Sequence, residues 1–258
     1  MASTFVFRNP PFAESEGRRR VLVTGAAGRI GSHFALHNRD KYELRLLVRG
    51  DEPKIEEISA YGDVVTCNFD NLDGLNLACN GIDTIVHLAA DHRASASWEE
   101  LLPNNIVGTY HLFEAAKAQG CRRVIYASTV QTLNGYPRGT QFRPEDPVNP
   151  TNLYGVSKCF GEAICRCYSN WGVSGIVLRI AAYETYESML GPRFQNSHWA
   201  FVSHRDLTQL IGLCVDDLKL QYAVFYGMSN NTPAMADTTN ARELLGYAPM
   251  DNIFEPVD

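Results

Sequence analysis

The sequence predicts an α/β fold in which a doubly wound parallel sheet carries helices on both faces. Six runs rich in Val, Ile and Leu alternate with segments of helical pattern. Continuous apolar runs of this length suit strands that are buried on both faces. No internal repeat or low-complexity linker interrupts the alternation. Together these observations favour a single large domain.

The elements follow in a regular order. The expected strands are residues 19–25, 42–48, 62–68, 83–90, 122–128 and 173–180. The expected helices are 28–38, 72–79, 105–119 and 151–171, with Asn71 as a candidate N-cap of the second. A loop-rich region then runs to about His204, followed by a helix (206–215), a strand (221–226) and a last helix (237–245). We therefore predict an N-terminal arm (1–17) and one domain (18–258), whose small, irregular C-terminal portion carries substrate-binding elements from about residue 180 onward.

Composition and charge narrow the function classes. The chain has 258 residues, 45% of them hydrophobic, and a formal net charge of −6, so binding to nucleic acid is not expected. No run of 18 apolar residues and no secretory signal pattern is found, so no membrane span is expected. The seven cysteines form no CxxC pair and show no zinc spacing. We expect reduced thiols, no metal and a cytoplasmic location.

A glycine-rich stretch, "VTGAAGRIG", lies where the first strand becomes the first helix. A phosphate-bearing ligand approaches the backbone closely at such a turn, where the helix N-terminus offers free N–H groups. The alternative interpretation is a tight turn with close packing. The context on both sides favours dinucleotide binding. The expected cofactor contacts here are Gly25, Ala27, Gly28, Arg29, Ile30 and Gly31.

Two further stretches are candidates for the same ligand. Asn68 and Asp70 follow the third strand, where Asp70 either meets an adenine or caps a helix. Leu88, Ala89 and Ala90 end the fourth strand, where small residues either admit a ribose and pyrophosphate or simply pack closely.

The end of the second strand bears on the choice of cofactor. An acidic residue there binds the 2′-hydroxyl of NAD, whereas a basic residue accommodates the 2′-phosphate of NADP. Val48 takes the acidic position, Arg49 follows it, and Asp51 comes slightly too late. The pattern favours NADP over NAD, unless Arg49 is a solvated loop residue.

The stretch "LYGVSK" places Tyr154 and Lys158 one helical turn apart. A free tyrosine has a pKa of about 10, and a neighbouring ammonium favours its phenolate. Tyr154 is therefore the candidate proton acceptor from a substrate hydroxyl, and Lys158 a candidate ligand of a cofactor ribose. Ser128 and Thr129 end the fifth strand, at the edge where ligands bind in such sheets, and are candidates to orient the substrate oxygen.

In this order, "TGAAGRIG", "AST" and "YGVSK" resemble the extended short-chain dehydrogenase/reductase superfamily. Asn105 to Thr109 matches its "NxxGT", which adds Asn105 to the cofactor set. The stretches "LYGVSKCFGE", "VLRIAAY", "SHRDL" and "NARELLGYAP" are similar to uronate dehydrogenases. The resemblance implies a Rossmann fold, oxidation of an anomeric hydroxyl of a uronate to a lactone with NAD, and a homodimer.

Position by position, the resemblance makes Tyr154 the base, Lys158 its lysine and Thr129 the counterpart of a serine, with Ser128 as the neighbouring alternative. His92 and Ala182 stand where the family has substrate-binding serines, and Asn196 where it has a carboxylate-binding arginine, which Arg193 could replace. The candidate substrate set is Asp91, His92, Gln131, Ala182, Arg193 and Asn196. The resemblance thus supports the fold and the reaction class better than it supports a uronate substrate or a preference for NAD.

Other interpretations remain open at this point. A nucleotide-sugar epimerase or dehydratase uses the same Tyr–Lys pair, but too few residues follow Arg179 for a substantial nucleotide-binding domain. A non-catalytic dinucleotide sensor has no reason to keep Tyr154, Lys158 and Thr129 in register.

His204 is interpreted as structural and Asp206 as the cap of the next helix, while a lone histidine such as His92 is more often a packing residue than a ligand.

Overall fold

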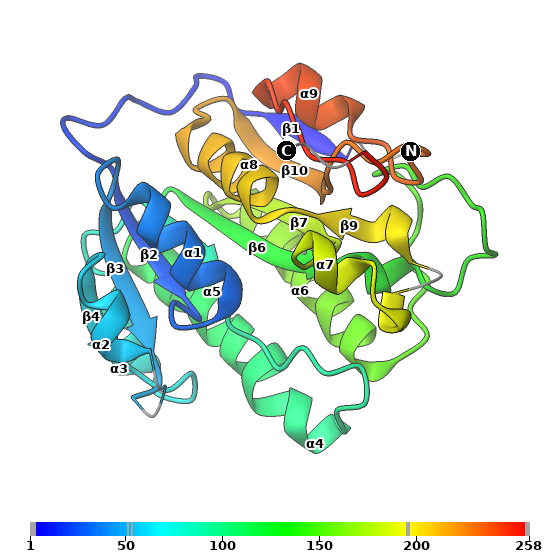
Figure 1. Ribbon diagram of the computed structural model, residues 1–258. Coiled ribbons are helices and arrows are strands. Elements are labelled where there is room, and N and C mark those ends of the chain that lie inside the picture. Colours follow the sequence, from blue (N-terminus) through cyan, green and yellow to red (C-terminus); the bar gives the residue numbers. More distant parts are fainter. Residues whose placement is uncertain (1–3, 51, 53, 195–196, 256–258) are drawn as a thin grey trace.

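The computed structural model describes residues 4–50, 52, 54–194 and 197–255 of the chain. Within them, eight strands form one sheet in the order β1-β10-β7-β6-β5-β2-β3-β4 (Figure 1). Every neighbouring pair is parallel except β1 with β10. From β2 the chain winds outward to β4, and from β5 it winds the other way to β10. This is the predicted doubly wound arrangement of a Rossmann fold.

The main-sheet strands are β1 (Phe5–Phe7), β2 (Arg20–Thr24), β3 (Glu43–Val48), β4 (Asp63–Thr66), β5 (Thr84–His87), β6 (Arg123–Thr129), β7 (Ser174–Ile180) and β10 (Leu220–Gly227). A small second sheet pairs β8 (Ala182–Tyr183) with β9 (Phe201–Val202). The α-helices are α1 (Arg29–Asn38), α2 (Ile55–Ile58), α3 (Leu72–Cys79), α4 (Trp98–Leu101), α5 (Thr109–Ala118), α6 (Leu153–Asn170), α7 (Tyr186–Met189), α8 (His204–Asp216) and α9 (Thr239–Leu245).

Helices cover both faces of the sheet (Figure 1). Val21 and Val23 of β2 point to the face where Phe34 of α1 and Leu207 of α8 pack. Leu22, between them, points to the other face, which α3, α5 and α6 cover. This alternation explains why the strands are continuously apolar, because each buries both of its sides.

Several helix boundaries differ from the sequence-based expectation. The helix expected over 105–119 begins with a π-helical stretch, Leu102–Gly108, before α5. Asn71 caps α3 as predicted, since its side chain accepts a hydrogen bond from the backbone N–H of Gly74 (2.9 Å). The prediction that Asp206 caps α8 is wrong. Ser203 is the cap, and its Oγ accepts from the backbone N–H of Asp206 (3.1 Å).

Asp206 is instead buried and holds the C-terminal segment in place. Its carboxylate accepts hydrogen bonds from Ser229 Oγ (2.7 Å) and from the backbone N–H groups of Met250 (2.9 Å) and Asp251 (3.0 Å). Three bonds converge on one fully buried carboxylate, which compensates for its lost hydration.

The described part of the N-terminal arm lies along the body of the protein. β1 extends the sheet by pairing with β10, and the backbone N–H of Phe12 bonds to the carbonyl of Leu218 (2.8 Å). The Phe12 ring centroid lies 5.3 Å from the guanidinium carbon of Arg122 and 5.9 Å from that of Arg123. The arm therefore adds an antiparallel edge strand that the sequence analysis did not predict.

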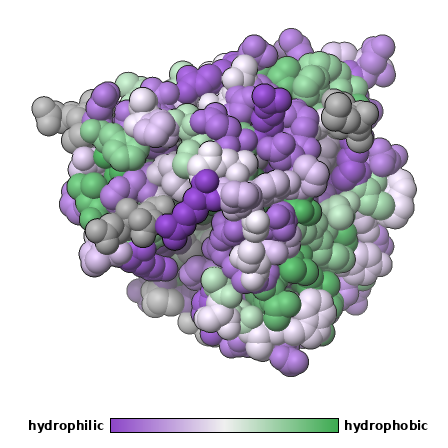
Figure 2. All heavy atoms as spheres, turned by 90° about the vertical axis from the view of Figure 1, so that its right-hand side faces the viewer, coloured by the Kyte–Doolittle hydropathy of each residue, from purple (hydrophilic) through white to green (hydrophobic). Residues whose placement is uncertain are grey.

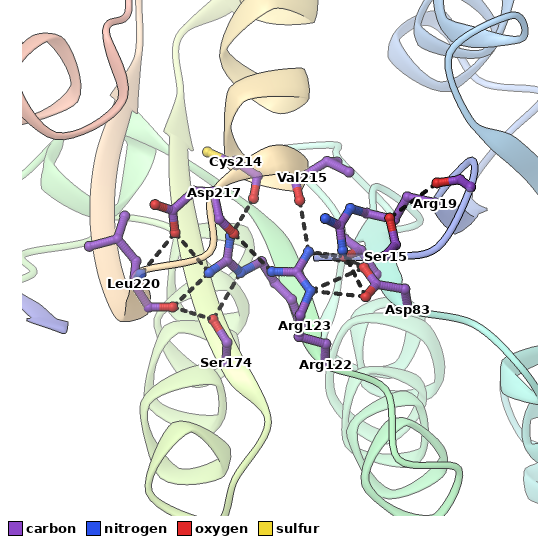
Figure 3. Close-up of polar contacts among 12 residues, drawn as sticks. Ser15, Arg19, Asp83, Arg122, Arg123, Ser174, Cys214, Val215, Asp217 and Leu220 are labelled. Atoms are coloured by element: carbon purple, nitrogen blue, oxygen red, sulfur yellow. Dashed lines mark hydrogen bonds and ion pairs between the residues drawn. The ribbon is translucent and has the colours of Figure 1, made fainter. Parts of the chain in front are cut away.

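A network of arginines joins the amino ends of the strands to the C-terminus of α8 (Figure 3). Arg123 is fully buried and donates to the carbonyls of Cys214 (2.6 Å) and Leu220 (2.6 Å) and to the carboxylate of Asp217 (3.0 Å). Burial lowers the pKa of Arg123 to about 10. Arg122 pairs with Asp83 (3.0 Å) beside it. This network lies at the sheet edge opposite to the one where ligands bind in such folds.

The surface view in Figure 2 shows hydrophobic residues in several separate areas among hydrophilic ones. Exposed apolar side chains include Trp98 (42% exposed), Tyr110 (45%) and Val156 (43%), which belong to α4, α5 and α6. Among the described residues, no helix combines the length and apolarity needed to cross a membrane.

The buried Arg123 network generates a prediction about stability. Arg123→Met keeps an apolar stem but removes the cation that pairs with the Asp217 carboxylate and the hydrogen bonds to the carbonyls of Cys214 and Leu220. We expect the free energy of unfolding to fall by about 3 kcal/mol or more, measured by chemical denaturation. Arg20→Met is the matched control, because Arg20 pairs with Glu43 at the surface (62% and 53% exposed) and should change stability by less than about 0.5 kcal/mol. If the two variants were equally stable, the buried network of Arg123 would not contribute to stability as we expect.

Candidate functional site

A cavity of about 750 Å³ opens at the carboxyl ends of the parallel strands. It lies between the loops that follow β2, β3, β5, β6 and β7, on both sides of the point where the strand order reverses. In doubly wound sheets this is the place where ligands bind. The predicted site residues that line it are Gly25, Ala27, Gly28, Arg29, Ile30, Gly31, Arg49, Leu88, Ala89, Ala90, Asp91, His92, Ser128, Thr129, Gln131, Tyr154, Lys158, Ala182 and Arg193.

The glycine loop forms one wall of this cavity. Gly25 has φ +65°, and a Cβ there would lie 2.9 Å from the backbone nitrogen of Ala89. A Cβ on Gly31 would lie 2.3 Å from the carbonyl oxygen of Gly25. Gly28 is the N-cap of α1 and offers no side chain to its first N–H groups, which leaves them to an anion. The loop therefore fits a dinucleotide pyrophosphate.

Three of the predicted site residues that the structure describes do not line the cavity. Asn68 and Asp70 are exposed, and Phe69 between them lines the cavity instead, so an apolar ring replaces the expected polar contact. Asn105 is buried, and its amide bonds to the backbone N–H (2.8 Å) and carbonyl (2.9 Å) of Asp91 and to Ser157 Oγ (3.0 Å). It fixes the loop after β5 to α6. Asn196 lies outside the described residues.

An acidic residue that the sequence analysis missed lines the cavity beside Arg49. One carboxylate oxygen of Glu52 accepts from the backbone N–H of Arg49 (2.7 Å) and of Gly50 (3.3 Å). The other lies 3.3 Å from Arg49 Nε. The Arg49 charge, which favoured NADP, therefore faces a carboxylate in the same loop. The spacing of three residues from Arg49 was the only sequence signal for it.

The catalytic candidates meet where α6 packs on β6. Tyr154, Lys158 and Thr129 all face the cavity, and Thr129 is close enough to the Tyr154 phenol to oppose part of the rise in its pKa. Lys158 Nζ donates to the carbonyl of Ala127 (2.8 Å) and lies 5.8 Å from the centroid of the Tyr154 ring. The structure thus brings Tyr154, Lys158 and Thr129 together, as the sequence predicts.

In the protein alone, the pKa of Tyr154 is raised and not lowered. Burial raises the pKa of Tyr154 to about 12, the hydrogen bond with Thr129 offsets only part of this, and the charge of Asp91 adds to the rise. Burial also lowers the pKa of Lys158 to about 7. Desolvation is the largest effect on both groups, because each loses water on the same packed surface.

Ser128 and Thr129 have different partners. Ser128 Oγ donates to Glu162 Oε1 (2.5 Å), and Glu162 forms a buried, two-bond ion pair with Arg179 (3.1 and 3.0 Å). Ser128 is thus held by this network, whereas Thr129 Oγ1 accepts from the backbone N–H of Gln131 (3.2 Å) and lies beside Tyr154. Glu162 was missed in the sequence, although it stands four residues after Lys158 on the same helix stripe.

Polar residues outside the glycine loop also line the cavity. Arg93 pairs with Asp91 (2.5 Å) and with Glu100 (2.8 Å), and its hydrogen bonds lower the pKa of Asp91. Gln131 accepts from Asn152 (2.9 Å), the N-cap of α6, which fixes its amide. His92 is exposed at the cavity edge. The polar groups there suit a ligand with several hydroxyl groups.

The chain is similar in sequence and in fold to known proteins. The family model described as the NAD dependent epimerase/dehydratase family matches residues 21–206. An NAD-dependent glucose-6-phosphate dehydrogenase of Haloferax volcanii is 30% identical over 250 residues, which cover 91% of this chain and 94% of the relative. The crystal structure of uronate dehydrogenase from Agrobacterium tumefaciens has a TM-score of 0.77 and 31% identity, and the match covers 92% of this chain and 86% of that one. A UDP-glucose 4-epimerase of Halalkalibacterium halodurans is matched over 62% of this chain but only 49% of its own length, at 30% identity.

Proposed function

We propose that this chain, which belongs to the NAD dependent epimerase/dehydratase family, oxidises the anomeric hydroxyl of a sugar and uses NAD as hydride acceptor. Family membership and the dehydrogenase relatives make it an NAD(P)-dependent oxidoreductase of the short-chain dehydrogenase/reductase type. The observation that carries the proposal is the convergence of Tyr154, Thr129 and Lys158 on the cavity that the glycine loop lines.

Each of the three side chains has a role in this proposal. The Thr129 hydroxyl and the Tyr154 phenol both bond to the substrate hydroxyl, and Tyr154 accepts its proton. Lys158 holds a ribose hydroxyl with its ammonium. The bound oxidised nicotinamide takes the hydride and adds a positive charge near the phenol, which favours its ionisation. The protein alone keeps the proton on Tyr154, because its pKa is about 12.

Glu52 supports NAD rather than NADP. Its carboxylate lies at the end of β3, where an acidic group would accept hydrogen bonds from a 2′-hydroxyl. A 2′-phosphate would meet that carboxylate, a like charge, and would have to compete with it for Arg49. We therefore favour NAD over the NADP that Arg49 alone suggests.

The substrate is a simple sugar in this proposal, either an aldose or a uronate. Arg93 is engaged by two carboxylates, so among the described residues Arg193, which is exposed at the cavity edge, is our candidate cation for an acidic substituent. The epimerase alternative is weaker, because epimerases of this family act on nucleotide sugars and the matched epimerase is about twice as long as the matching region. The apolar side chains exposed on α5 and α6, Tyr110 and Val156 among them, support a homodimer.

The first prediction tests the reaction itself. With a panel of aldoses and uronates, we expect net reduction of NAD, read by nicotinamide absorbance, and loss of at least about a thousandfold in kcat in Tyr154→Phe. Since a proton acceptor must be deprotonated, kcat/KM for oxidation should rise with pH, by up to about tenfold per pH unit while the phenol is mostly protonated. No net reduction with any sugar would favour an epimerase, and a flat pH profile would contradict the role of Tyr154.

The second prediction concerns Glu52. Glu52→Gln removes the charge that opposes a 2′-phosphate and keeps the size of the side chain. We expect the ratio of kcat/KM for NADP to that for NAD to rise about tenfold. Arg49→Ala is the companion variant and should lower the same ratio. If wild type prefers NADP, or if Glu52→Gln leaves the ratio unchanged, the argument for NAD is wrong.

The third prediction concerns the substituent on the sugar. Arg193→Ala should raise KM for a uronate about tenfold and leave KM for the matching neutral aldose within about twofold, because only the uronate offers a carboxylate. Arg205→Ala is the control, since Arg205 pairs with Asp251 at the surface (2.6 Å) and does not line the cavity. Equal loss for both sugars would show that Arg193 shapes the loop and does not bind an acid.

A further inference from the structure

An ion pair crosses the cavity between its two walls. Arg29, the first residue of α1, donates to both carboxylate oxygens of Glu184 (3.0 and 2.8 Å), which follows β8. Both residues line the cavity. The pair links two segments 155 residues apart in the sequence, so it joins the glycine loop to the wall that follows β7.

The two partners are held differently. The Glu184 side chain is only 14% exposed and also accepts from Ser188 Oγ (3.0 Å), whereas the Arg29 side chain is 59% exposed. Beneath them, the Tyr183 ring stacks on His204 (4.2 Å between centroids) and lies 5.7 Å from the Arg29 guanidinium. Glu184 is therefore fixed to its wall, and Arg29 is the partner that can turn away.

The pyrophosphate of a dinucleotide and the carboxylate of Glu184 would both bind the guanidinium of Arg29. A guanidinium binds a carboxylate or a phosphate group through two parallel N–H bonds, and one fork cannot serve both fully. Arg29 lies at the N-terminus of α1, where the glycine loop admits a dinucleotide. In the structure this fork is occupied by the carboxylate.

We propose that Glu184 is an internal competitor for the cofactor: its carboxylate occupies the Arg29 guanidinium until the pyrophosphate of the dinucleotide displaces it. This inference rests on the proposed use of NAD and adds a residue to it. Cofactor binding then frees Glu184 on the wall that also carries Ala182, where its carboxylate is available to the hydroxyl groups of the sugar. The cofactor must accordingly bind before the sugar.

The test is a double-mutant cycle on NAD affinity, measured by titration calorimetry without sugar. Glu184→Gln removes the competing charge at constant size and should tighten NAD binding about two- to fivefold, the range of a partly exposed ion pair. Arg29→Gln should weaken binding. The double variant should bind like Arg29→Gln alone, because Glu184 competes only through Arg29. Glu43→Gln, which breaks a surface pair with Arg20 away from the cavity, is the control and should bind like wild type.

The outcomes separate this inference from the proposed function. If wild type does not bind NAD, the proposed function fails. If wild type binds NAD and Glu184→Gln binds it equally well or more weakly, the competition is wrong while the function stands. If Glu184→Gln tightens binding equally with and without Arg29, Glu184 acts as a general negative charge and the proposal is also wrong. A KM for the sugar that rises at least about threefold in Glu184→Gln would support the release of Glu184 to the substrate.

Discussion

The packing of α6 against β6 and β7 is the constraint on which the rest of the site depends. Tyr154, Lys158 and Glu162 recur every four residues and form one stripe of the helix. Each lies against a different residue of β6: Tyr154 against Thr129, Lys158 against the carbonyl of Ala127, and Glu162 against Ser128. Close approach is possible because position 161 is a glycine, and a Cβ there would lie 2.0 Å from the Tyr126 ring. A helix shifted by one residue would lose all three contacts together.

The same burial that aligns the catalytic groups works against their ionisation. Lys158 is 3% exposed and Tyr154 is 7% exposed, so each charged form loses its hydration. In the protein alone, the phenol keeps its proton and the pKa of the lysine falls to about 7. The fold therefore positions the catalytic groups and excludes water from them. In our proposal, the positive charge that favours the phenolate is supplied by the bound oxidised nicotinamide. The proposed reaction therefore requires the complex of protein, oxidised cofactor and sugar.

The sequence predicts local features well and partnerships poorly. Strand boundaries, the glycine loop and the Asn71 cap follow from apolar runs, backbone conformation and short-range hydrogen bonds, all encoded within a few residues. Asp206, by contrast, looks like a helix cap in its local sequence, but it binds the backbone some 45 residues later. Glu184 meets Arg29 only because β8 folds over α1. Such pairs depend on the assembled topology, which no local pattern records.

The charged side chains that line the cavity include three arginines, each paired with a carboxylate. Arg29, Arg49 and Arg93 each contact a carboxylate of the same cavity lining, namely Glu184, Glu52 and Asp91. A lining of paired charges attracts an anion less than three free arginines would, because each pair presents little net charge. At these three arginines, an incoming dinucleotide gains affinity only where its own groups replace a carboxylate with good geometry. This makes the walls of the cavity selective for the arrangement of charge on the ligand.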